Sequence, residues 1–377
     1  MDDEMAMLQD ACARFMQKEM VPHLAKWEDQ GFVDRDSWLK AGEAGLLCAS
    51  IPVEYGGGGG TLGHEATVYQ EIARAGLTGG FGAGHSVSSG IVAHYILAYG
   101  TEEQKRNWLP PMARGEIIGA VAMTEPAAGS DLQRIRTSGA KVQGGYLLNG
   151  SKTYISNGQT ADLVVVVAKT DPSAGAKGIS LLVVEPAKVD GFIRGRNLEK
   201  IGMHAQDTSE LFFEDCLVPA ENILGGEPGA GFFQLMQQLA WERIVISISA
   251  TVAMERAVSL ATEFARDRPM FGQKLIDFQN TQFKLAECKT LATVARTFVD
   301  TLMGRLLAGE LDPAVAAMAK LWTTEAQGKV VDECLQLFGG AGYMAEYPIS
   351  RLYTEARIAR IFGGTSEVMK LIVARTL

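Results

Sequence analysis

The chain has 377 residues and a net charge of -9 at pH 7, with 47% hydrophobic and 21% charged residues. This length allows more than one layer or domain with its own core, and the composition is ordinary for a soluble globular protein. The negative charge argues against general nucleic-acid binding or a membrane-surface role, since both favour basic patches. Any anionic ligand must therefore be met by local basic groups.

Cysteine usage and hydropathy exclude several further classes of protein. No CxxC pair occurs, which predicts reduced thiols and no metal site for the five cysteines, Cys12, Cys48, Cys216, Cys288 and Cys334. His85 and His204 lack a second metal-ligand group at suitable spacing, so we interpret them as packing or loop residues. No apolar run approaches the ~18 residues of a membrane span. The acidic, amphipathic N-terminus is unlike a targeting peptide, so we expect a cytoplasmic protein, or a mitochondrial-matrix protein whose transit peptide has been removed.

Residues 1–115 carry apolar side chains at helical spacing and are expected to form an N-terminal helical domain. The first helix is expected to end at Val21-Pro22, since proline disfavours a helical conformation in the residue before it. Thr101–Gln104 is a helix-opening signal, and Pro110-Pro111 predicts a stop. The run Gly56–Gly60 is interpreted as a flexible connector, with a close approach of the backbone to a ligand as the alternative.

Residues 116–228 switch to short or alternating apolar runs separated by glycine and Asn-Gly turns. They predict a small β-barrel or sandwich, with strands at 117–123, 146–148, 163–168, 179–184 and 210–213. Residues 229–377 return to helical spacing and predict an antiparallel bundle, with helices at 231–266, 273–308, 313–338 and 364–375. The expected fold class is therefore α+β, with helices, strands and helices in that order.

Two short cassettes follow apolar strands in the middle segment. The first is Met123-Thr124-Glu125-Pro126 with Gly129-Ser130-Asp131, and the second is Tyr154-Ile155-Ser156-Asn157-Gly158. Each offers a hydroxyl and free backbone amides at the end of a strand, a layout suited to gripping the edge of a planar heterocycle. Both cassettes resemble the segments that hold a flavin ring in the acyl-CoA dehydrogenase family, whose architecture has the same order of helices, strands and helices.

That family's reaction needs a base that removes the α-proton of an acyl thioester, and donors that stabilise the thioester oxygen. In most members the base is a glutamate in a tyrosine-glutamate-glycine-threonine motif near the C-terminus. Here the motif reads Phe362-Gly363-Gly364-Thr365, so the usual base position is Gly363. The stretch resembles the long-chain subgroup, and isovaleryl-CoA dehydrogenases share the glycine. Both subgroups carry the base on the first long helix of the bundle, where this chain has Glu242.

The residues around Glu242 support that assignment independently. None of its helical neighbours at three and four residues is cationic: Gln238, Leu239, Val245 and Ile246. Arg243 is next in sequence and points about 100° away around the helix. Burial should raise the pKa of such a carboxylate and suit it to act as a base near neutral pH. The residues alone favour the alternative, a glutamate paired elsewhere in the bundle; the subgroup resemblance and the empty usual position favour catalysis.

The resemblance implies contacts with FAD and the acyl carrier, residue by residue. Thr124 matches the threonine on the pyrimidine side of the flavin ring, with Met123 lending backbone groups, and Ser156 matches the hydroxyl near N5. Tyr154 stands where many members have tryptophan, so ring packing is expected with a changed geometry. Ser130 matches a residue beside the pantetheine and is also assigned to the cofactor site. The alternative for each residue is ordinary polarity at a strand end.

The same resemblance implies roles for residues near the C-terminal motif and on the bundle. The backbone N–H of Gly363 would help to hold the thioester oxygen, and Arg243 would counter the CoA phosphates or orient the bundle. Further residues would reach the FAD from a neighbouring subunit or close on the dinucleotide: Arg268, Phe271, Gln279, Gln336, Gly339, Gly340, Thr365 and Glu367. Contacts from a second subunit imply a homo-oligomer, a tetramer of paired dimers. A helix-capping arginine and a tight turn are the alternative.

We therefore predict an FAD-dependent acyl-CoA dehydrogenase that forms trans-2-enoyl-CoA from long-chain or branched-chain thioesters. The resemblance implies that electrons pass to an electron-transfer flavoprotein. One alternative is a flavin oxidase or monooxygenase on the same scaffold. Another is a non-catalytic flavoprotein partner of an active homologue, which Gly363 favours and Glu242 opposes.

Overall fold

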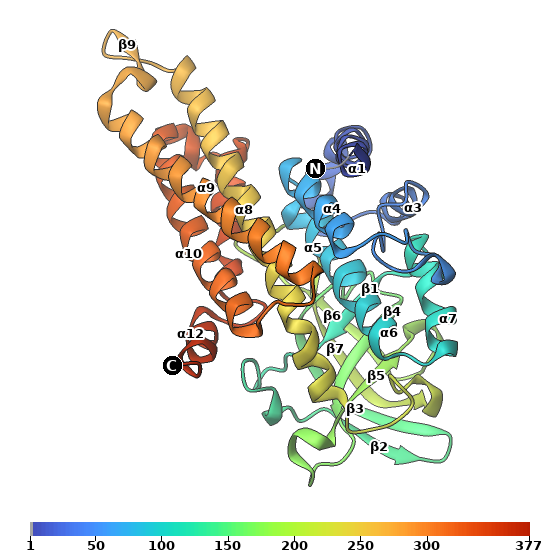
Figure 1. The fold of residues 1–377 in the computed structure, drawn as a ribbon. Helices are drawn as coiled ribbons and strands as arrows, with labels where there is room; N and C mark the ends of the chain where they lie inside the picture. Colours follow the sequence, from blue (N-terminus) through green and yellow to red (C-terminus); the bar gives the residue numbers. More distant parts are fainter. Residues whose placement is uncertain (1–2) are drawn as a thin grey trace. The chain divides into compact units, whose positions relative to one another are not determined.

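The computed structural model describes residues 3–377 and has an α+β fold, as predicted. N-terminal helices precede a β-sheet domain, and a helical bundle follows it (Figure 1). The chain also divides into two compact units, which we describe separately. Unit 1 comprises Met1–Val68, Gly80–Lys200 and His204–Leu239, and unit 2 comprises Tyr69–Gly79, Ile201–Met203 and Ala240–Leu377.

The first part of the chain is helical, as the apolar spacing predicts. Its helices are α1 (Asp3–Phe15), α2 (Leu24–Gln30), α3 (Arg35–Glu43), α4 (Leu62–Arg74), α5 (Ala83–His85), α6 (Ala93–Tyr99) and α7 (Glu102–Ala113). The predicted helix end at Val21-Pro22 is wrong. A π-helical turn at Met16–Met20 and a 3-10 turn at Val21–His23 connect α1 to α2. Proline is accepted there because the first turn of a helix leaves its N–H groups without intrahelical partners.

Of three local predictions, two concern the ends of α7 and one concerns the Gly56–Gly60 run. The capping signal is confirmed: the Thr101 hydroxyl accepts a hydrogen bond from Gln104 N at 3.2 Å, and Gln104 Oε1 accepts one from Thr101 N at 3.0 Å. Pro110-Pro111 lies inside α7 and does not stop it. In the glycine run, a Cβ at Gly57 would lie 2.3 Å from the Ile51 carbonyl oxygen. The glycines therefore permit close packing on the chain's own backbone, and the interpretation as a flexible connector is wrong.

A seven-stranded sheet forms the middle of the chain. Its strands are β1 (Gly119–Ala122), β2 (Ser138–Val142), β3 (Gly145–Ser156), β4 (Leu163–Lys169), β5 (Ile179–Val184), β6 (Phe192–Asn197) and β7 (Thr208–Pro219). The order is β1-β4-β2-β3-β7-β6, with β5 paired to β4. β1 runs parallel to β4, whereas β3 and β7 are antiparallel. The sequence patterns missed β2 and β6, whose side chains are largely polar or exposed.

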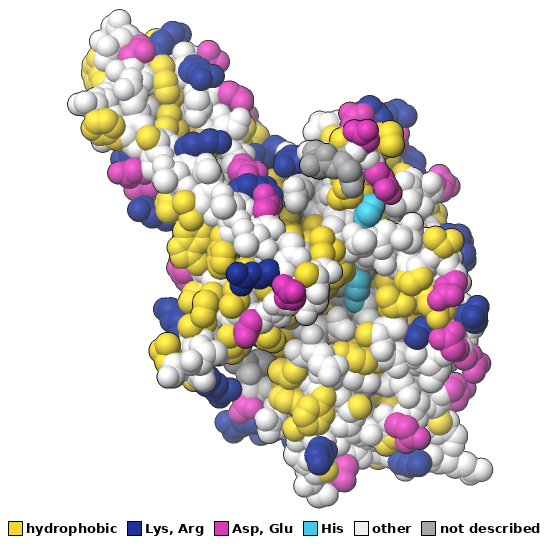
Figure 2. Space-filling model, viewed as in Figure 1, with side chains coloured by type: hydrophobic (Ala, Val, Ile, Leu, Met, Phe, Trp, Pro, Cys, Tyr) yellow, Lys and Arg dark blue, Asp and Glu magenta, His cyan; other side chains and the backbone are white. Residues whose placement is uncertain are grey.

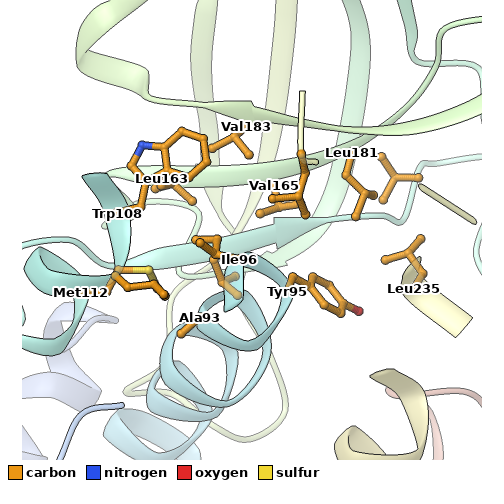
Figure 3. Packing of buried hydrophobic residues seen from close by; sticks show 14 of the residues in the cluster. Ala93, Tyr95, Ile96, Trp108, Met112, Leu163, Val165, Leu181, Val183 and Leu235 are labelled. Carbon is orange, nitrogen blue, oxygen red and sulfur yellow. The ribbon is translucent and has the colours of Figure 1, made fainter. Parts of the chain in front are cut away.

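Strand β4 is buried on both faces, which explains its unbroken apolar run. Leu163, Val165 and Val167 face a core shared with α6 and α7, in which Trp108 and Ile96 pack (Figure 3). The alternate residues Val164, Val166 and Ala168 belong to a second core on the other face, with side chains from β3, β5 and β7. The partly buried side chain of Met123, just after β1, packs against the first core. The first cassette is thus anchored at the edge of a well-packed strand.

The C-terminal bundle contains α8 (Gly231–Asp267), α9 (Gln279–Leu307), α10 (Pro313–Phe338), α11 (Pro348–Ala356) and α12 (Ser366–Ala374). A short hairpin of β8 (Pro269–Met270) and β9 (Gln273–Lys274) joins α8 to α9, so the predicted helix at 273–308 starts later than expected. Figure 1 shows α8, α9 and α10 side by side. Their core includes Met254 of α8, Ala292 of α9 and Val330 of α10.

Surface and composition provide three further observations. Helix α8 is long and apolar enough to cross a membrane by composition, but 67% of that window is buried in the protein, as in a core helix. Within residues 3–377, no group of His, Cys, Asp or Glu is arranged to hold a metal ion. On the face in Figure 2, acidic side chains are interspersed with Lys and Arg.

Candidate active site

Unit 1 brings the two predicted cassettes together. Met123 and Thr124 follow β1, and the second cassette begins within β3. The Thr153 N–H donates to the Thr124 carbonyl oxygen at 2.9 Å, so the cassettes are hydrogen-bonded to each other. The side chains of Thr124 and Ser156 are half-buried, and neither is sealed in the core. Two hydroxyl side chains therefore lie on adjoining segments at the edge of the sheet, where they could hydrogen-bond to the edge of a planar heterocycle.

A buried ion pair lies beneath these cassettes, and sequence reasoning missed it. Lys152 of β3 has no exposed side-chain surface, and its Nζ donates to Glu125 Oε1 at 2.9 Å and to the Met123 carbonyl oxygen at 3.0 Å. The Glu125 carboxylate also accepts hydrogen bonds from Arg136 N at 2.6 Å and Thr137 N at 3.0 Å. No local pattern pointed to it, because the strand predicted at 146–148 stops before Lys152, whereas β3 continues to Ser156.

Burial and pairing shift the pKa values of the two groups. Burial lowers the pKa of Lys152 to about 8, against the opposing effect of the Glu125 charge. Burial alone would raise the pKa of Glu125, but the hydrogen bond to Thr137 and the charge of Lys152 lower it overall. The ion pair thus fixes the backbone on both sides of Thr124 through charge-assisted hydrogen bonds.

The second cassette has an unusual backbone. Tyr154 has φ 60° and Asn157 has φ 62°, in the left-handed region that most side chains avoid. A register shift between Lys152 and Ile155 accompanies the first of these, and it leaves the Tyr154 side chain 69% exposed. Asn157 is buried, and its Nδ2 donates to the carbonyl oxygens of Gly84 at 3.0 Å and Gly119 at 2.9 Å. Asn157, predicted from the sequence to lie in the second cassette and in an Asn-Gly turn, therefore ties the end of β3 to the start of β1.

The predicted acyl-carrier residue of unit 1 lies on a loop. Ser130 is exposed and precedes a short 3-10 turn at Leu132–Arg134. Just before Ser130 the chain makes a tight turn, in which the backbone of Glu125 pairs with the backbone of Ala128. Ser130 is thus accessible to a ligand that approaches this edge of the sheet.

Unit 2 brings the two predicted catalytic positions together. Glu242 of α8 is 7% exposed, and Ile246 lies one helical turn after it on the same face. Gly363 lies against Ile246, because a Cβ on Gly363 would be 2.4 Å from Ile246 Cδ1. Its φ of 61° is also a conformation that suits glycine. The empty usual base position and the proposed substitute base therefore border one face of α8.

Arg243, next to the candidate base, is 5% exposed. Burial lowers the pKa of its guanidinium, and the charge of Glu242 opposes that shift. Its buried Nε has no hydrogen-bond partner within residues 3–377.

The residues predicted to contact FAD from the bundle lie mainly on its surface. Arg268 and Gln279 are exposed on either side of the β8–β9 hairpin, and Phe271 in that hairpin is 91% exposed. Gln336, Gly339 and Gly340 are exposed at the end of α10. Thr365 caps α12 by accepting a hydrogen bond from Val368 N at 3.2 Å, and Glu367 is exposed in the first turn of that helix. The Phe271 ring lies edge-on to the Phe278 ring, with 6.4 Å between the ring centroids.

Comparison with known proteins agrees with this arrangement. Family models match three consecutive parts of the chain: "Acyl-CoA dehydrogenase, N-terminal domain" over residues 2–116, "middle domain" over 120–216 and "C-terminal domain" over 229–377. Together these models match well over half of the chain.

Curated relatives and solved structures agree over nearly the full length. The long-chain specific acyl-CoA dehydrogenase of Sus scrofa is 46% identical over 98% of this chain and 85% of its own. The isovaleryl-CoA dehydrogenase of Solanum tuberosum is 34% identical over 100% of this chain and 91% of its own. The crystal structure of an acyl-CoA dehydrogenase from Geobacillus kaustophilus has a TM-score of 0.95 and 45% identity, covering 100% of this chain and 98% of the other. This chain belongs to the acyl-CoA dehydrogenase family.

Proposed function

We propose that the protein uses FAD to dehydrogenate an acyl-CoA thioester between its α- and β-carbons, forming trans-2-enoyl-CoA. The observation that carries the proposal is that, in unit 2, the glycine at the family's usual base position packs against Ile246, one helical turn after the buried carboxylate of Glu242. Gly363 has no side chain that could act as a base, whereas Glu242 carries a carboxylate that can accept a proton and lies on the face of α8 against which Gly363 packs. The protein would thus be active with its base on α8.

In unit 1, Thr124 and Ser156 would hold the flavin ring through their hydroxyls, with Met123 supplying backbone groups. The hydrogen-bonded cassettes and the ion pair beneath them support this role, since they fix the backbone that carries both hydroxyls. A glutaryl-CoA dehydrogenase from Mycobacterium smegmatis was solved in complex with FADH2; it has 26% identity and a TM-score of 0.92, covering 100% of this chain and 95% of the other. FAD, when bound, would accept the hydride that leaves the β-carbon.

In unit 2, Glu242 would remove the α-proton as negative charge develops on the thioester oxygen. The Gly363 N–H would donate to that oxygen and stabilise the charge. The balance is simple: the α-carbon loses a proton to the carboxylate, the β-carbon loses a hydride, and a carbon–carbon double bond forms. Burial of Glu242 supports a base that is not solvated by bulk water.

The substrate is proposed to be a long-chain thioester, with a branched-chain thioester as the second choice. The relative named for long-chain substrates is 46% identical, whereas the one named for isovaleryl-CoA is 34% identical. Kinetics with purified protein test this choice. Short, long and branched saturated acyl-CoA thioesters should be compared by kcat/KM with an artificial electron acceptor. A preference for the long thioesters supports the proposal, and a preference for isovaleryl-CoA overturns it.

We propose that the electrons pass to an electron-transfer flavoprotein and that four copies of the chain assemble. A solved structure described as an electron transferring flavoprotein of Acidaminococcus fermentans has 35% identity and a TM-score of 0.94, covering 100% of this chain and 98% of the other. The exposed Phe271 in the hairpin and the exposed Arg268 just before it support assembly, because they would contact the FAD of a neighbouring copy. Relatives named as mitochondrial and a relative from Bacillus subtilis support either a matrix or a cytoplasmic location.

Gly340 tests the proposed dinucleotide contact. Apart from its chain neighbours, a Cβ at this position would meet no atom of residues 3–377 within 4 Å, so Gly340→Ala should change the free energy of unfolding by less than about 0.5 kcal/mol. If FAD approaches the backbone here, the added methyl group should lower the flavin content of purified protein. Gly304→Ala is the control, because Gly304 lies in α9 with the same open surroundings. Equal flavin content in both variants would remove Gly340 from the site.

Moving the base provides a further test. Gly363→Glu alone would strain the backbone, because φ is 61° and the Cβ would lie 2.4 Å from Ile246 Cδ1. In a Glu242→Gln protein, we therefore expect Gly363→Glu to raise kcat only when Ile246→Ala is also present and makes room for the side chain. The expected increase is at least ~10-fold, because a positioned general base contributes roughly 10²–10⁴-fold to the rate. The Glu242→Gln protein, the same protein with Gly363→Glu, and the same protein with both Gly363→Glu and Ile246→Ala should be compared at equal flavin content. No recovery with Ile246→Ala would mean that position 363 does not face the α-carbon.

A further inference from the structure

A second buried lysine, Lys320, holds the loop that contains Gly363. Lys320 lies in the first half of α10 and is 0% exposed. Its Nζ donates a hydrogen bond to the carbonyl oxygen of Gly364 at 2.5 Å. Fully burying an ammonium group is unfavourable unless a partner compensates for its lost hydration. Here the partner is a backbone carbonyl next to the residue proposed to bind the thioester oxygen.

The surroundings of Lys320 disfavour its charged form. Burial and the nearby charge of Arg243 together lower the pKa of Lys320 to about 8, while the charges of Glu325 and Glu367 oppose the shift. At pH 7 the lysine is therefore mostly charged. An uncharged apolar side chain would fill the same volume without the desolvation cost, so stability alone gives a weak reason for a lysine here.

The rest of the loop is held from the same helix. Ser366 Oγ donates to Glu325 Oε1 at 2.7 Å, and Glu325 also accepts a hydrogen bond from Arg360. On the far side of Gly364, Thr365 caps α12. Gly363 and Gly364 both have positive φ, at 61° and 95°, and thus lack the steric restriction that a Cβ provides. A segment of two such glycines depends on external contacts to fix its peptide planes, and Lys320 fixes one of them, the Gly364–Thr365 plane, through the Gly364 carbonyl.

We propose that Lys320 is a positioning residue for the dehydrogenation: it fixes the Gly363–Gly364 segment so that the Gly363 N–H points at the thioester oxygen. This inference rests on the proposed function, in which that N–H stabilises the developing charge. Lys320 does not touch the substrate in this account. It acts through the backbone, and it differs from Glu242 because it takes no proton from the substrate.

The test uses three variants of the full-length protein. Lys320→Met removes the donor and keeps an unbranched side chain, and Lys320→Arg restores a cationic donor. Lys329→Met is the matched control, since Lys329 is exposed on the same helix. The probe is trans-2-enoyl-CoA carrying 13C at the thioester carbon, bound to each oxidised, flavin-loaded protein. The carbonyl stretching band, isolated by isotope-edited infrared spectroscopy, reports how strongly the protein polarises that oxygen.

A positioning role predicts a specific pattern. In Lys320→Met the carbonyl band should shift toward its frequency in free enoyl-CoA, and kcat should fall about 100-fold, as for a small misplacement of a catalytic group. KM should change much less, and Lys320→Arg should recover part of both effects. Lys329→Met should match the native protein. The rate constant kcat is expressed per bound flavin, so that loss of folded protein does not imitate the effect.

Two results would overturn the inference. In the first, Lys320→Met has a lower melting temperature but the native carbonyl band and native kcat per flavin, which would assign Lys320 to bundle stability alone. In the second, Lys320→Met folds and behaves like Lys329→Met in every readout. Failure of the proposed function itself is distinguishable, because the native protein would then neither polarise the bound carbonyl nor oxidise any acyl-CoA. If Lys320→Met does not fold, the decision passes to Lys320→Arg: a carbonyl band shifted part of the way toward that of free enoyl-CoA, with a lowered kcat per flavin, supports the role, and a native band and native kcat beside a lowered melting temperature contradict it.

Discussion

Glu242→Gln is expected to lower kcat for acyl-CoA dehydrogenation by about 10²–10⁴-fold, the range that a positioned general base contributes. The amide keeps the size of the carboxylate but cannot take the α-proton. Because Glu242 is 7% exposed, solvent should not readily replace it. KM for the thioester should change little, since the lost interaction belongs to the transition state.

The rate of flavin reduction by acyl-CoA, followed by stopped-flow absorbance without oxygen, measures this effect directly. Glu263→Gln is the control, because Glu263 is an exposed glutamate on the same helix. The control should keep the native rate. A Glu242→Gln rate within a few-fold of the native rate would show that another carboxylate is the base.

Lys152→Met is expected to destabilise the protein by about 3–5 kcal/mol, because it leaves the Glu125 carboxylate buried without its cation. It also removes the hydrogen bond to the Met123 carbonyl, so flavin should be lost in parallel with stability. Glu125→Gln combined with Lys152→Met should recover part of the stability, since no charge is then left unpaired. Urea unfolding followed by circular dichroism provides the free energies.

An exposed ion pair in the same unit provides the matched control. Arg114 Nη2 lies 2.6 Å from Glu116 Oε2, with side chains 58% and 49% exposed. Removing such a pair should cost about 0–1 kcal/mol. If Lys152→Met costs no more than Arg114→Met, the buried pair is not what secures the first cassette.

The same pair predicts a pH dependence. The lowered pKa of Glu125 contributes stability that is present above its unfolded pKa and is lost as pH falls through its folded pKa. For Lys152, the folded pKa is about 8 against 10.5 for the free side chain. Between those values the unfolded chain binds more protons, so this group makes stability rise with pH. The difference in unfolding free energy between the native protein and the double variant, measured against pH, isolates these contributions.

Much of the fold was predictable because local patterns and burial agree. The apolar run at Leu163–Ala168 became β4, buried on both faces, and Thr101 with Gln104 caps α7. Strands β2 and β6 were missed because their side chains are largely polar or exposed, and pairing with neighbours stabilises them. The glycine run was misinterpreted because its contacts are with backbone at Ile51 and Ala49, which no local pattern shows.

The candidate site divides in the same way. The cassettes and Glu242 could be named from residue types and resemblance, and Glu242 is buried in the structure, within reach of the charge of Arg243. Lys152 and Lys320 could not, because each acts through a backbone carbonyl brought to it by tertiary packing. From sequence alone, a lysine is expected to lie at the protein surface, even when its neighbours in the chain are apolar. Only the structure shows that both are fully buried.

The most direct test of the proposed chemistry is the visible spectrum of the purified protein as acyl-CoA thioesters are added without oxygen. We expect an oxidised flavin that a long-chain thioester bleaches in the native protein and leaves oxidised in Glu242→Gln. Equal bleaching in both proteins would contradict the assignment of Glu242. A native flavin that stays oxidised with every thioester would contradict the proposed activity.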